Sequence, residues 1–448
     1  MRAKPEEGRL LGEFPIADFG GDRVELADLN GDGELELLIL QSAGQLKSQL
    51  HADRSDVDEA DRSLHCLTAL SLEGDVLWQS GRPYSRDVPF TCHGPKSVVV
   101  EDINGDGRCE VAVIRGSSLV ILDGASGEQQ SSVGLPSDNF DLLHTGRFGR
   151  PEEGRQLICK VNDAAYPPWS YSNPAMVFGA DLSVWREPFA VPGAGHNMVA
   201  MDIDGDGRDE LLIGYSLLDD DLSEVWTLDL GEGFDYVANH ADHIAVSDVD
   251  DDGRLEVRYA GSEDFFVADL GGNLLWQAPG VHSQRSVEGP WGPDGEKRII
   301  MCEKKKGLWG LDAAGNVLWH RTDVNGYAGS TVRWRRGPGR NEWALFEPRL
   351  RPMAPTPYES DPSWSRGLWP CFIDGDGQLL DVFPWKDDYA QPRRVIRAER
   401  SYDCGVRYTP IARDIDGDGL DEVLILDRHR VCIFRSPEES GAHTSGPP

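Results

Sequence analysis

The apolar residues of this chain fall in short runs that are separated by turns rich in glycine and aspartate. Runs such as "SVVVE", "LELLIL" and "EVLIL" are β-prone and too short for typical helices. Apolar runs broken by Gly and Asp turns are typical of β-hairpins. The pattern therefore predicts an all-β protein built from short antiparallel strands.

One turn repeats along the chain. The loop D-x-[ND]-x-D-G-x-x-E occurs as "DLNGDGELE" from Asp28, "DINGDGRCE" from Asp102, "DIDGDGRDE" from Asp202, "DVDDDGRLE" from Asp248 and "DIDGDGLDE" from Asp414. Each copy lies between two apolar runs. A second element, as in "VADLGGNLLWQ" and "GLDAAGNVLWH", reads as strand, tight turn and strand. One repeat is therefore four antiparallel strands, which is a propeller blade.

The repeat predicts eight blades, with seven as the alternative. First strands are expected near residues 24, 98, 141, 198, 244, 287, 330 and 409, and units three, six and seven lack the acidic loop. The last unit ends at "RVCIF" without a fourth strand, which the N-terminal "GRLLGEFPI" can supply, removing an exposed edge. We expect residues 9–436 to form a single eight-bladed β-propeller, with residues 1–8 and 437–448 disordered.

The acidic loops have the chemistry of calcium sites. Ca²⁺ prefers about six to eight oxygen ligands, and loop positions 1, 3, 5 and 9 supply four oxygen-bearing side chains. None of these positions holds the Cys or His that a soft metal prefers. We therefore predict about five structural Ca²⁺ ions, held by Asp28, Asn30, Asp32, Glu36, Asp102, Asn104, Asp106, Glu110, Asp202, Asp204, Asp206, Glu210, Asp248, Asp250, Asp252, Glu256, Asp414, Asp416, Asp418 and Glu422.

The composition and net charge limit the kinds of partner that the protein can bind. The formal charge of −33 excludes nucleic acid as an obvious partner, since phosphate binding needs a basic surface. Five Ca²⁺ ions would leave about −23, so an acidic substrate needs a local cluster of cations. The sequence has no run of membrane-span length and no signal-peptide core, and its eight Cys are scattered. We expect reduced core thiols and a monomer without a membrane partner, cytoplasmic, or secreted if a signal peptide had been removed.

Strand parity places the candidate chemistry on the face opposite the acidic loops. The segments before the first strands share a face with the loops between second and third strands. Six of the eleven His residues lie in these leading segments. The candidates there are His93, Lys96, His144, His196, Asn197, His240, His243, His282, Arg285, Tyr327, Arg407 and Tyr408. They are expected to ring the central channel.

Three long loops fall on the same face, at residues 41–66, 160–175 and 347–370. Their aromatic and basic residues include Trp169, Tyr171, Arg349, Arg351, Trp364 and Trp369. Aromatic rings stack on sugars, and guanidinium groups pair with carboxylates in a bidentate manner. The loops therefore favour binding of an acidic polysaccharide or oligosaccharide, although long loops could also merely cover the propeller's end.

The acidic loops resemble the FG-GAP repeats of integrin-like propellers. The stretch 193–257, with "GHN" before "DIDGDGRDE" and "HAD" before the next strand, resembles the eight-bladed rhamnogalacturonan lyases of polysaccharide lyase family 11. Propeller lyases that act on ulvan or on rhamnose–glucuronate caps are close alternatives. The resemblance implies β-elimination on a uronate-containing, rhamnose-bearing glycan.

This reaction needs a cation at the uronate carboxylate, a base for the C5 proton and an acid for the leaving oxygen. Arg285 and Arg407 are candidates for the cation, followed by Lys96. His196 and His240 are candidate bases, since imidazole titrates near working pH, and Tyr327 or His243 is the candidate acid. The other residues in these segments and long loops are expected to bind substrate: His93, His144, Asn197, His282, Tyr408, Trp169, Arg349, Arg351, Trp364 and Trp369.

Two other functions fit an eight-bladed propeller. A non-catalytic propeller that binds a glycan or a protein would need the aromatic and Arg residues but has no use for so many titratable His. A quinone-dependent dehydrogenase is disfavoured, because the Gly–Trp turns are irregular here and the chain has no adjacent Cys pair.

Overall fold

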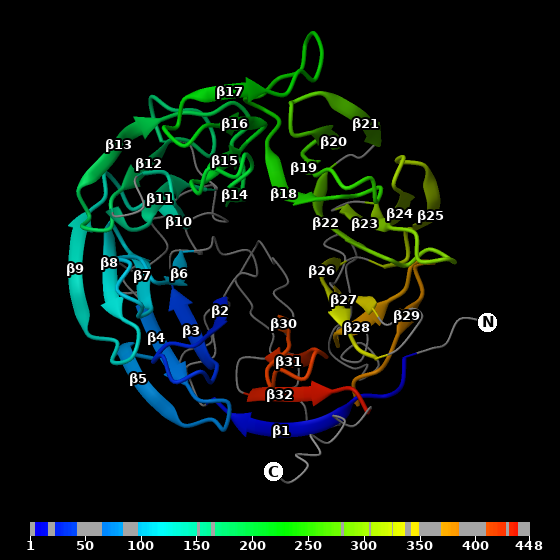
Figure 1. The fold of residues 1–448 in the computed structure, drawn as a ribbon, viewed down its shortest axis with the longest axis horizontal. Coiled ribbons are helices and arrows are strands. Elements are labelled where there is room, and N and C mark those ends of the chain that lie inside the picture. Colours follow the sequence, from blue (N-terminus) through cyan, green and yellow to red (C-terminus); the bar gives the residue numbers. More distant parts are fainter. Residues whose placement is uncertain are drawn as a thin grey trace, which may run out of the picture.

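The computed structural model describes residues 5–16, 23–42, 65–83, 97–149, 153–162, 166–278, 282–303, 306–324, 326–336, 342–348, 369–384, 409–426 and 430–437. The regular elements in these ranges are all β-strands, arranged in eight four-stranded antiparallel sheets. Figure 1 shows the sheets as blades around a common centre, with first strands innermost and fourth strands at the rim. The prediction of eight blades is confirmed.

The strands of the first four blades are β2 (Arg23–Ala27), β3 (Glu36–Ser42), β4 (His65–Leu70) and β5 (Val76–Gly81); β6 (Val98–Glu101), β7 (Glu110–Arg115), β8 (Ser118–Asp123) and β9 (Gln129–Gly134); β10 (Phe140–Gly146), β11 (Gln156–Val161), β12 (Ala175–Phe178) and β13 (Val184–Phe189); and β14 (Met198–Met201), β15 (Glu210–Ile213), β16 (Ser216–Leu218) and β17 (Glu224–Thr227).

The strands of the last four are β18 (Ala241–Ser247), β19 (Glu256–Gly261), β20 (Phe265–Asp269) and β21 (Leu274–Ala278); β22 (Ser283–Gly289), β23 (Arg298–Glu303), β24 (Gly307–Asp312) and β25 (Val317–Arg321); β26 (Gly326–Arg333), β27 (Glu342–Pro348), β28 (Cys371–Ile373) and β29 (Leu379–Leu380); and β30 (Thr409–Arg413), β31 (Glu422–Leu426), β32 (Arg430–Arg435) and β1 (Arg9–Pro15).

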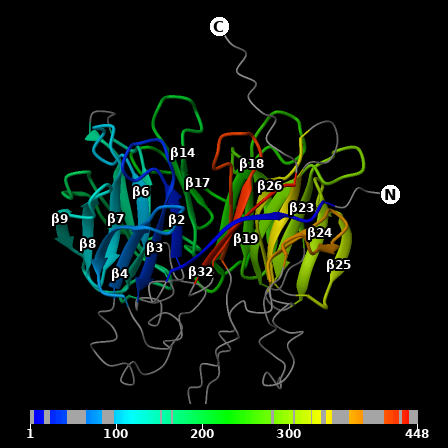
Figure 2. The ribbon, with the colours of Figure 1, turned by 90° about the horizontal axis from the view of Figure 1, so that it is seen from below.

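Blade eight closes the ring with strands from both ends of the chain. Strand β1 pairs antiparallel with β32, from Arg9 opposite Arg435 to Pro15 opposite Arg430. The blue and red ribbons of β1 and β32 lie side by side in both Figure 1 and Figure 2. The predicted closure by "GRLLGEFPI" beside "RVCIF" is therefore confirmed, and β32 is not left as an open edge.

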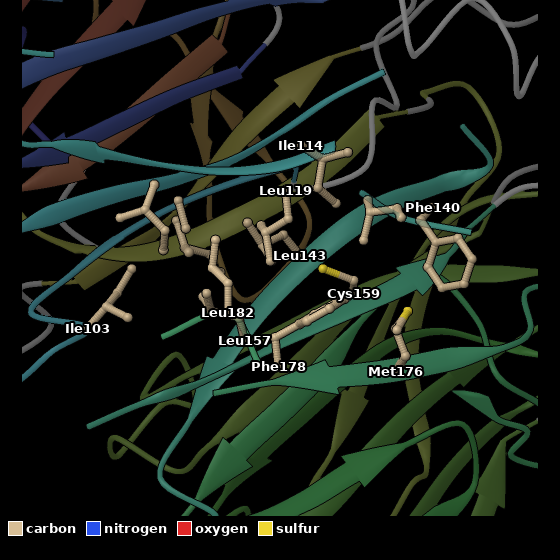
Figure 3. Packing of buried hydrophobic residues seen from close by; sticks show 14 of the residues in the cluster. Ile103, Ile114, Leu119, Phe140, Leu143, Leu157, Cys159, Met176, Phe178 and Leu182 are labelled. Atoms are coloured by element: carbon tan, nitrogen blue, oxygen red, sulfur yellow. The ribbon is translucent and has the colours of Figure 1, made fainter. Parts of the chain in front are cut away.

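The hydrophobic core is divided among the contacts between neighbouring blades. The second strands are buried on both faces because each packs against a blade on either side, as β11 and β15 do along their whole length. Between blades two and three, Ile114 and Leu119 pack against Leu143, Cys159 and Phe178 (Figure 3). Five of the six described cysteines are buried, and none of the six forms a disulfide. No helix that could cross a membrane is found in the described ranges.

First strands in three blades begin earlier than the sequence suggested. Strands β18, β22 and β26 start at Ala241, Ser283 and Gly326, three or four residues before the expected positions. His243, Arg285 and Tyr327 therefore lie inside strands and not ahead of them, and His144 likewise lies within β10. The physical reason is a bulge or register shift near the start of each of these four strands, which lets a strand continue through polar residues.

Candidate active site

Three imidazoles and one carboxylate meet where blades four, five and six begin. Nε2 of His196 lies 3.5 Å and Nε2 of His240 lies 3.7 Å from Oδ1 of Asp242. Nε2 of His282 lies 3.6 Å from the other oxygen, Oδ2. The side chain of Asp242 is only 4% exposed, whereas the three imidazoles keep partial access to solvent. We call these four residues the His–Asp centre.

β-Bulges aim the polar side chains of this region. Asp242 is the extra residue between the paired positions Ala241 and His243, and Gln284 is the extra residue between Ser283 and Arg285. Bulges next to functional sites commonly redirect a side chain that strand alternation would send elsewhere. Here they bring Gln284 Nε2 to 2.9 Å from Asp242 Oδ1, across the boundary between blades five and six.

Two neighbours orient the imidazoles. Asn162 Oδ1 lies 2.9 Å from His196 Nδ1, and because an amide oxygen only accepts, Nδ1 of His196 is the donor. Ser262 Oγ lies 3.0 Å from Nδ1 of His240. Both contacts occupy Nδ1, the ring nitrogen that does not face Asp242. Nε2 of each imidazole is thereby directed at Asp242.

The charge state of the centre follows from this geometry. Burial by itself would raise the pKa of Asp242, but the contact with His240 and the charges of His196, His240 and His282 lower it below its ordinary value. Asp242 is therefore an anion, and its Oδ2 is buried without a hydrogen-bond partner. With Nδ1 of a neutral His196 protonated, its Nε2 lone pair faces a carboxylate, which repels it. A cation, either a proton on an imidazole or a metal ion, must balance the centre.

The residues present fit a divalent metal ion. Donor atoms of His196, His240 and Asp242 lie within 4.8 Å of one another, and the orphaned Oδ2 of Asp242 is a further oxygen donor. Imidazole nitrogen together with carboxylate oxygen suits several divalent metals. This set differs from the all-oxygen acidic loops, so a metal here would be a separate site from those predicted.

A second chain of contacts reaches blade seven. The Tyr327 hydroxyl donates to Gln284 Oε1 at 3.0 Å, and Gln284 in turn donates to Asp242. The guanidinium carbon of Arg285 lies 5.5 Å from the centre of the Tyr327 ring, a cation–π contact. Arg285 is exposed. A cationic and a phenolic group therefore flank the His–Asp centre on one side.

The loop 166–174 of blade three flanks the other side. Its Tyr171 ring lies 5.0 Å from the His240 ring and 6.2 Å from the His196 ring, measured between centroids. The fully buried Lys160 holds the loop by donating to the carbonyls of Val161 at 2.6 Å and Ser172 at 2.7 Å. The Tyr171 ring is thus presented by a loop with a satisfied, buried anchor.

Two residues that the sequence suggests for the site, His243 and Trp369, are not placed for the roles expected of them. Nδ1 of the half-buried His243 is shielded from solvent without a hydrogen-bond partner, and desolvation, together with the charges of Arg285 and Arg258, lowers its pKa to about 3. An imidazole that stays neutral near neutral pH has no readily released proton, so His243 is unsuited to act as the acid. Trp369 is 5% exposed and packs in the core, with Nε1 donating to the Phe383 carbonyl, so it offers no face to a sugar.

The remaining candidates divide into three groups. Asn197 accepts from the Ile244 backbone N–H at 3.0 Å, which ties blade four to blade five. His144 accepts a hydrogen bond from the Thr145 backbone N–H, and Trp169 is half-buried in the blade-three loop. Outside the described residues lie His93, Lys96, Arg349, Arg351, Trp364, Arg407 and Tyr408.

The acidic loops share one hydrogen-bond pattern. In all five, the ninth-position Glu accepts from the backbone N–H of the second residue, at 2.7–3.0 Å. The first Asp accepts from the N–H of the sixth-position Gly, which has a positive φ that favours glycine. Acidic oxygens come together in three of them, as at Asp202, Asp204 and Asp206. Several acidic clusters can therefore bind a metal ion.

Comparison with known proteins gives distant relatives. No protein-family model matches the chain. Rhamnogalacturonan exolyase YesX of Bacillus subtilis (strain 168) is 23% identical over 370 residues, covering 70% of this chain and 56% of the relative. Rhamnogalacturonan endolyase YesW of the same organism is 23% identical over 372 residues, covering 78% of this chain and 52% of the relative. The chain thus spans about half the length of the curated relatives it matches.

Solved structures share the fold. The crystal structure of the exotype lyase YesX superposes with a TM-score of 0.60 at 17% identity, over 97% of this chain and 75% of that one. The biofilm matrix protein Bap1 of V. cholerae superposes with a TM-score of 0.57 at 10% identity, over 97% of this chain and 92% of that one. Structural similarity at these identities establishes the propeller fold and leaves the chemistry to be argued from the site.

Proposed function

We propose that the protein is a polysaccharide lyase that cleaves a rhamnogalacturonan-type, uronate-containing glycan by β-elimination. The observation that carries the proposal is the His–Asp centre, an arrangement of titratable groups flanked by an exposed Arg285. The similarity to two rhamnogalacturonan lyases supports the same substrate class. A lyase acting on ulvan or on rhamnose–glucuronate glycans is the nearest variant of the proposal.

In the proposed reaction, Arg285 pairs with the uronate carboxylate and so acidifies the C5 proton. An imidazole of the His–Asp centre removes that proton, and the C5–H electrons form the C4=C5 double bond. The C4–O bond breaks, its electron pair goes to the leaving oxygen, and that oxygen takes a proton from an acid. Tyr327 is assigned as the acid because its hydroxyl is held beside Arg285 and is linked through Gln284 to Asp242.

A metal ion in the His–Asp centre would be held by His196, His240 and Asp242. When bound, it would add positive charge toward the substrate carboxylate. His196 and His240 would then be occupied as ligands, and His282 would be the imidazole that takes the C5 proton. Without the metal, His196 and His240 keep the role of base. Asp242 in either case holds the imidazoles in place.

The acidic loops of blades one, two, four and five are assigned as structural Ca²⁺ sites, in the manner of FG-GAP repeats. Their support is the shared hydrogen-bond pattern and the converging carboxylates, which are the only donors in the clusters at Asp202 and Asp248 among the described residues. Their role in the proposal is to hold the turns between first and second strands. They take no part in the chemistry.

The proposal is tested with a panel of uronate glycans that includes rhamnogalacturonan, polygalacturonan and ulvan. β-Elimination leaves a 4,5-unsaturated uronate, whose ultraviolet absorbance rises with turnover. We expect a rise with rhamnogalacturonan that is lost in Asp242→Asn, a variant whose folding is checked by melting. Absence of the signal with all three glycans would contradict the lyase assignment.

A non-catalytic glycan-binding propeller is the second candidate, since the Tyr171 ring and the exposed Arg285 beside the His–Asp centre would also serve binding without chemistry. It predicts binding of a uronate glycan, seen by calorimetry, without any unsaturated product. The two candidates are separated by running calorimetry and the absorbance assay on the same preparation.

A further inference from the structure

The acidic loop of blade eight differs from the other four at one position of the neighbouring strand. Strand pairing places Phe434 opposite Val423, so Arg435 follows opposite the loop residue Glu422. In blades two and five, the residue opposite the loop Glu is an aspartate, Asp123 opposite Glu110 and Asp269 opposite Glu256. By the same register, blades one and four carry Ser71 and Asp219 there. Among the five blades with an acidic loop, only blade eight has a cationic residue opposite the loop Glu.

The architecture explains why this exchange is possible. In the other four blades, the residue opposite the Glu opens the turn between third and fourth strands, and its carbonyl accepts a turn hydrogen bond. Blade eight has no such turn, because its fourth strand, β1, comes from the other end of the chain. The position is therefore released from turn formation and can carry a long cationic side chain.

The Arg435 guanidinium lies among the carboxylates that define the loop. Its Nη2 is 2.7 Å from Asp416 Oδ2, 3.3 Å from Asp418 Oδ2 and 3.4 Å from Glu422 Oε1. These three residues occupy loop positions 3, 5 and 9, three of the four positions expected to bind metal. A second guanidinium, that of Arg336 from blade seven, lies 2.8 Å from Asp418 Oδ2.

Arginines near the other loops do something different. Arg254 of blade five bonds one carboxylate of its loop, that of Asp252 at 2.6 Å, and its side chain is 84% exposed. Arg208 of blade four likewise reaches a single loop carboxylate, that of Asp206, and its side chain is 43% exposed. The Arg435 side chain is only 19% exposed and contacts three. Position and burial therefore separate Arg435 from these surface pairs.

We propose that Arg435 is the built-in cation of the blade-eight loop: its guanidinium takes the place of a divalent ion, and removing it opens a latent metal site. The inference rests on the proposed calcium role of the acidic loops and is independent of the lyase activity. Asp414 Oδ1 is buried without a hydrogen-bond partner, so an oxygen stays available to an ion once Arg435 is gone. The blade that closes the ring thus holds its loop together without a calcium supply.

The experiment counts the Ca²⁺ ions retained by the full chain after gel filtration, using elemental analysis. Arg435→Ala should retain one ion more than the wild type, and Arg435→Ala with Asp416→Asn should return to the wild-type count. Arg254→Ala, the matched control at a surface arginine, should leave the count unchanged. Asp202→Asn should lose one ion, which tests the calcium role of an ordinary loop.

A second variant gives an answer even if Arg435→Ala does not fold. Asp414→Asn in the otherwise wild-type chain should leave the ion count unchanged, because its loop holds no Ca²⁺. Loss of one ion in this variant, or an unchanged count in folded Arg435→Ala, would overturn the proposal. If Asp202→Asn retains as many ions as the wild type, the general calcium role of the acidic loops is contradicted instead. The two failures are therefore distinguishable.

Discussion

His196 shows how a single imidazole is given a direction. Its Nδ1 donates to Asn162 of blade three, and its Nε2 faces Asp242 of blade five, so one ring spans three blades. Its backbone N–H also donates to the Ala241 carbonyl at 3.1 Å. A residue so placed has its ring orientation fixed before any substrate arrives, which is what a proton-transfer group or a metal ligand requires.

The first prediction concerns this ring. His196→Ala should lower kcat by about 10²–10⁴-fold, the usual worth of a general acid–base group, with little change in melting temperature. Kinetics and thermal melting of the same preparation measure both. His320→Ala is the control, since His320 stacks on Trp309 outside the His–Asp centre. A stability loss with full activity in the folded fraction would make His196 a structural hydrogen-bonder.

The second prediction concerns Asn162, which acts through His196. Asn162→Ala removes the acceptor that fixes Nδ1 as the protonated nitrogen, so the proper tautomer and ring orientation are lost part of the time. Outer partners of this kind are commonly worth about 10–100-fold in activity or metal affinity. We expect kcat to fall by that factor, with its pH profile displaced and KM nearly unchanged. An unaltered pH profile would contradict the positioning role.

At the scale of elements, the repeated acidic loop explains why the strand order and the ring closure could be predicted from the sequence. Five copies of one acidic loop between apolar runs give the strand order, and the missing fourth strand of the last unit predicts the closure by β1. Only part of the His–Asp centre could be predicted from the sequence. His196, His240 and His282 stand out as titratable residues, but Asp242, Gln284, Asn162 and Ser262 were not among the predicted site residues.

β-Bulges explain why Asp242 and Gln284 were not among the predicted site residues. Strict alternation along β18 does not predict that Asp242, and not His243, joins the His–Asp centre, because one extra residue at the bulge resets the alternation. The proximity of Asp242 to His240 in "HAD" was the available signal. The prediction that Trp369 binds substrate has a different difficulty. Trp369 lies two residues before β28 and packs in the hydrophobic core.

The third prediction tests the loop that presents Tyr171. Lys160→Met keeps the volume of the fully buried side chain but leaves the Val161 and Ser172 carbonyls without their donor. Unsatisfied buried groups typically cost about 1–3 kcal/mol each. We expect a lower free energy of unfolding in denaturant and faster hydrogen exchange across residues 166–174. Lys306→Met, at an exposed lysine, should change neither.

At the scale of the whole molecule, the proposed Ca²⁺ ions and the ring closure are expected to be separate sources of stability. Chelation should lower the melting temperature, because ions that bind only the folded state stabilise it by mass action. Asp202→Asn should cost stability more than it costs kcat of the folded protein. An unchanged melting temperature on chelation would contradict a structural role for the ions, and loss of turnover at full stability would place an ion in the chemistry instead.

Ring closure depends on the inward side of β1 and the residue that follows it. Ile16 is fully buried and Phe14 is 8% exposed, and both pack with Val431 and Ile433 of β32, whereas Leu11 on the same strand is 46% exposed. Large-to-small substitutions in a core typically cost about 2–5 kcal/mol, because transfer energy is lost and a cavity remains. Ile16→Ala should therefore lower the free energy of unfolding by an amount in that range, while Leu11→Ala should be nearly neutral. Denaturant unfolding of the two variants measures the difference directly. Equal effects would mean that β1 contributes only its backbone hydrogen bonds to the closure, and the propeller would then depend on pairing alone to keep its first and last strands together.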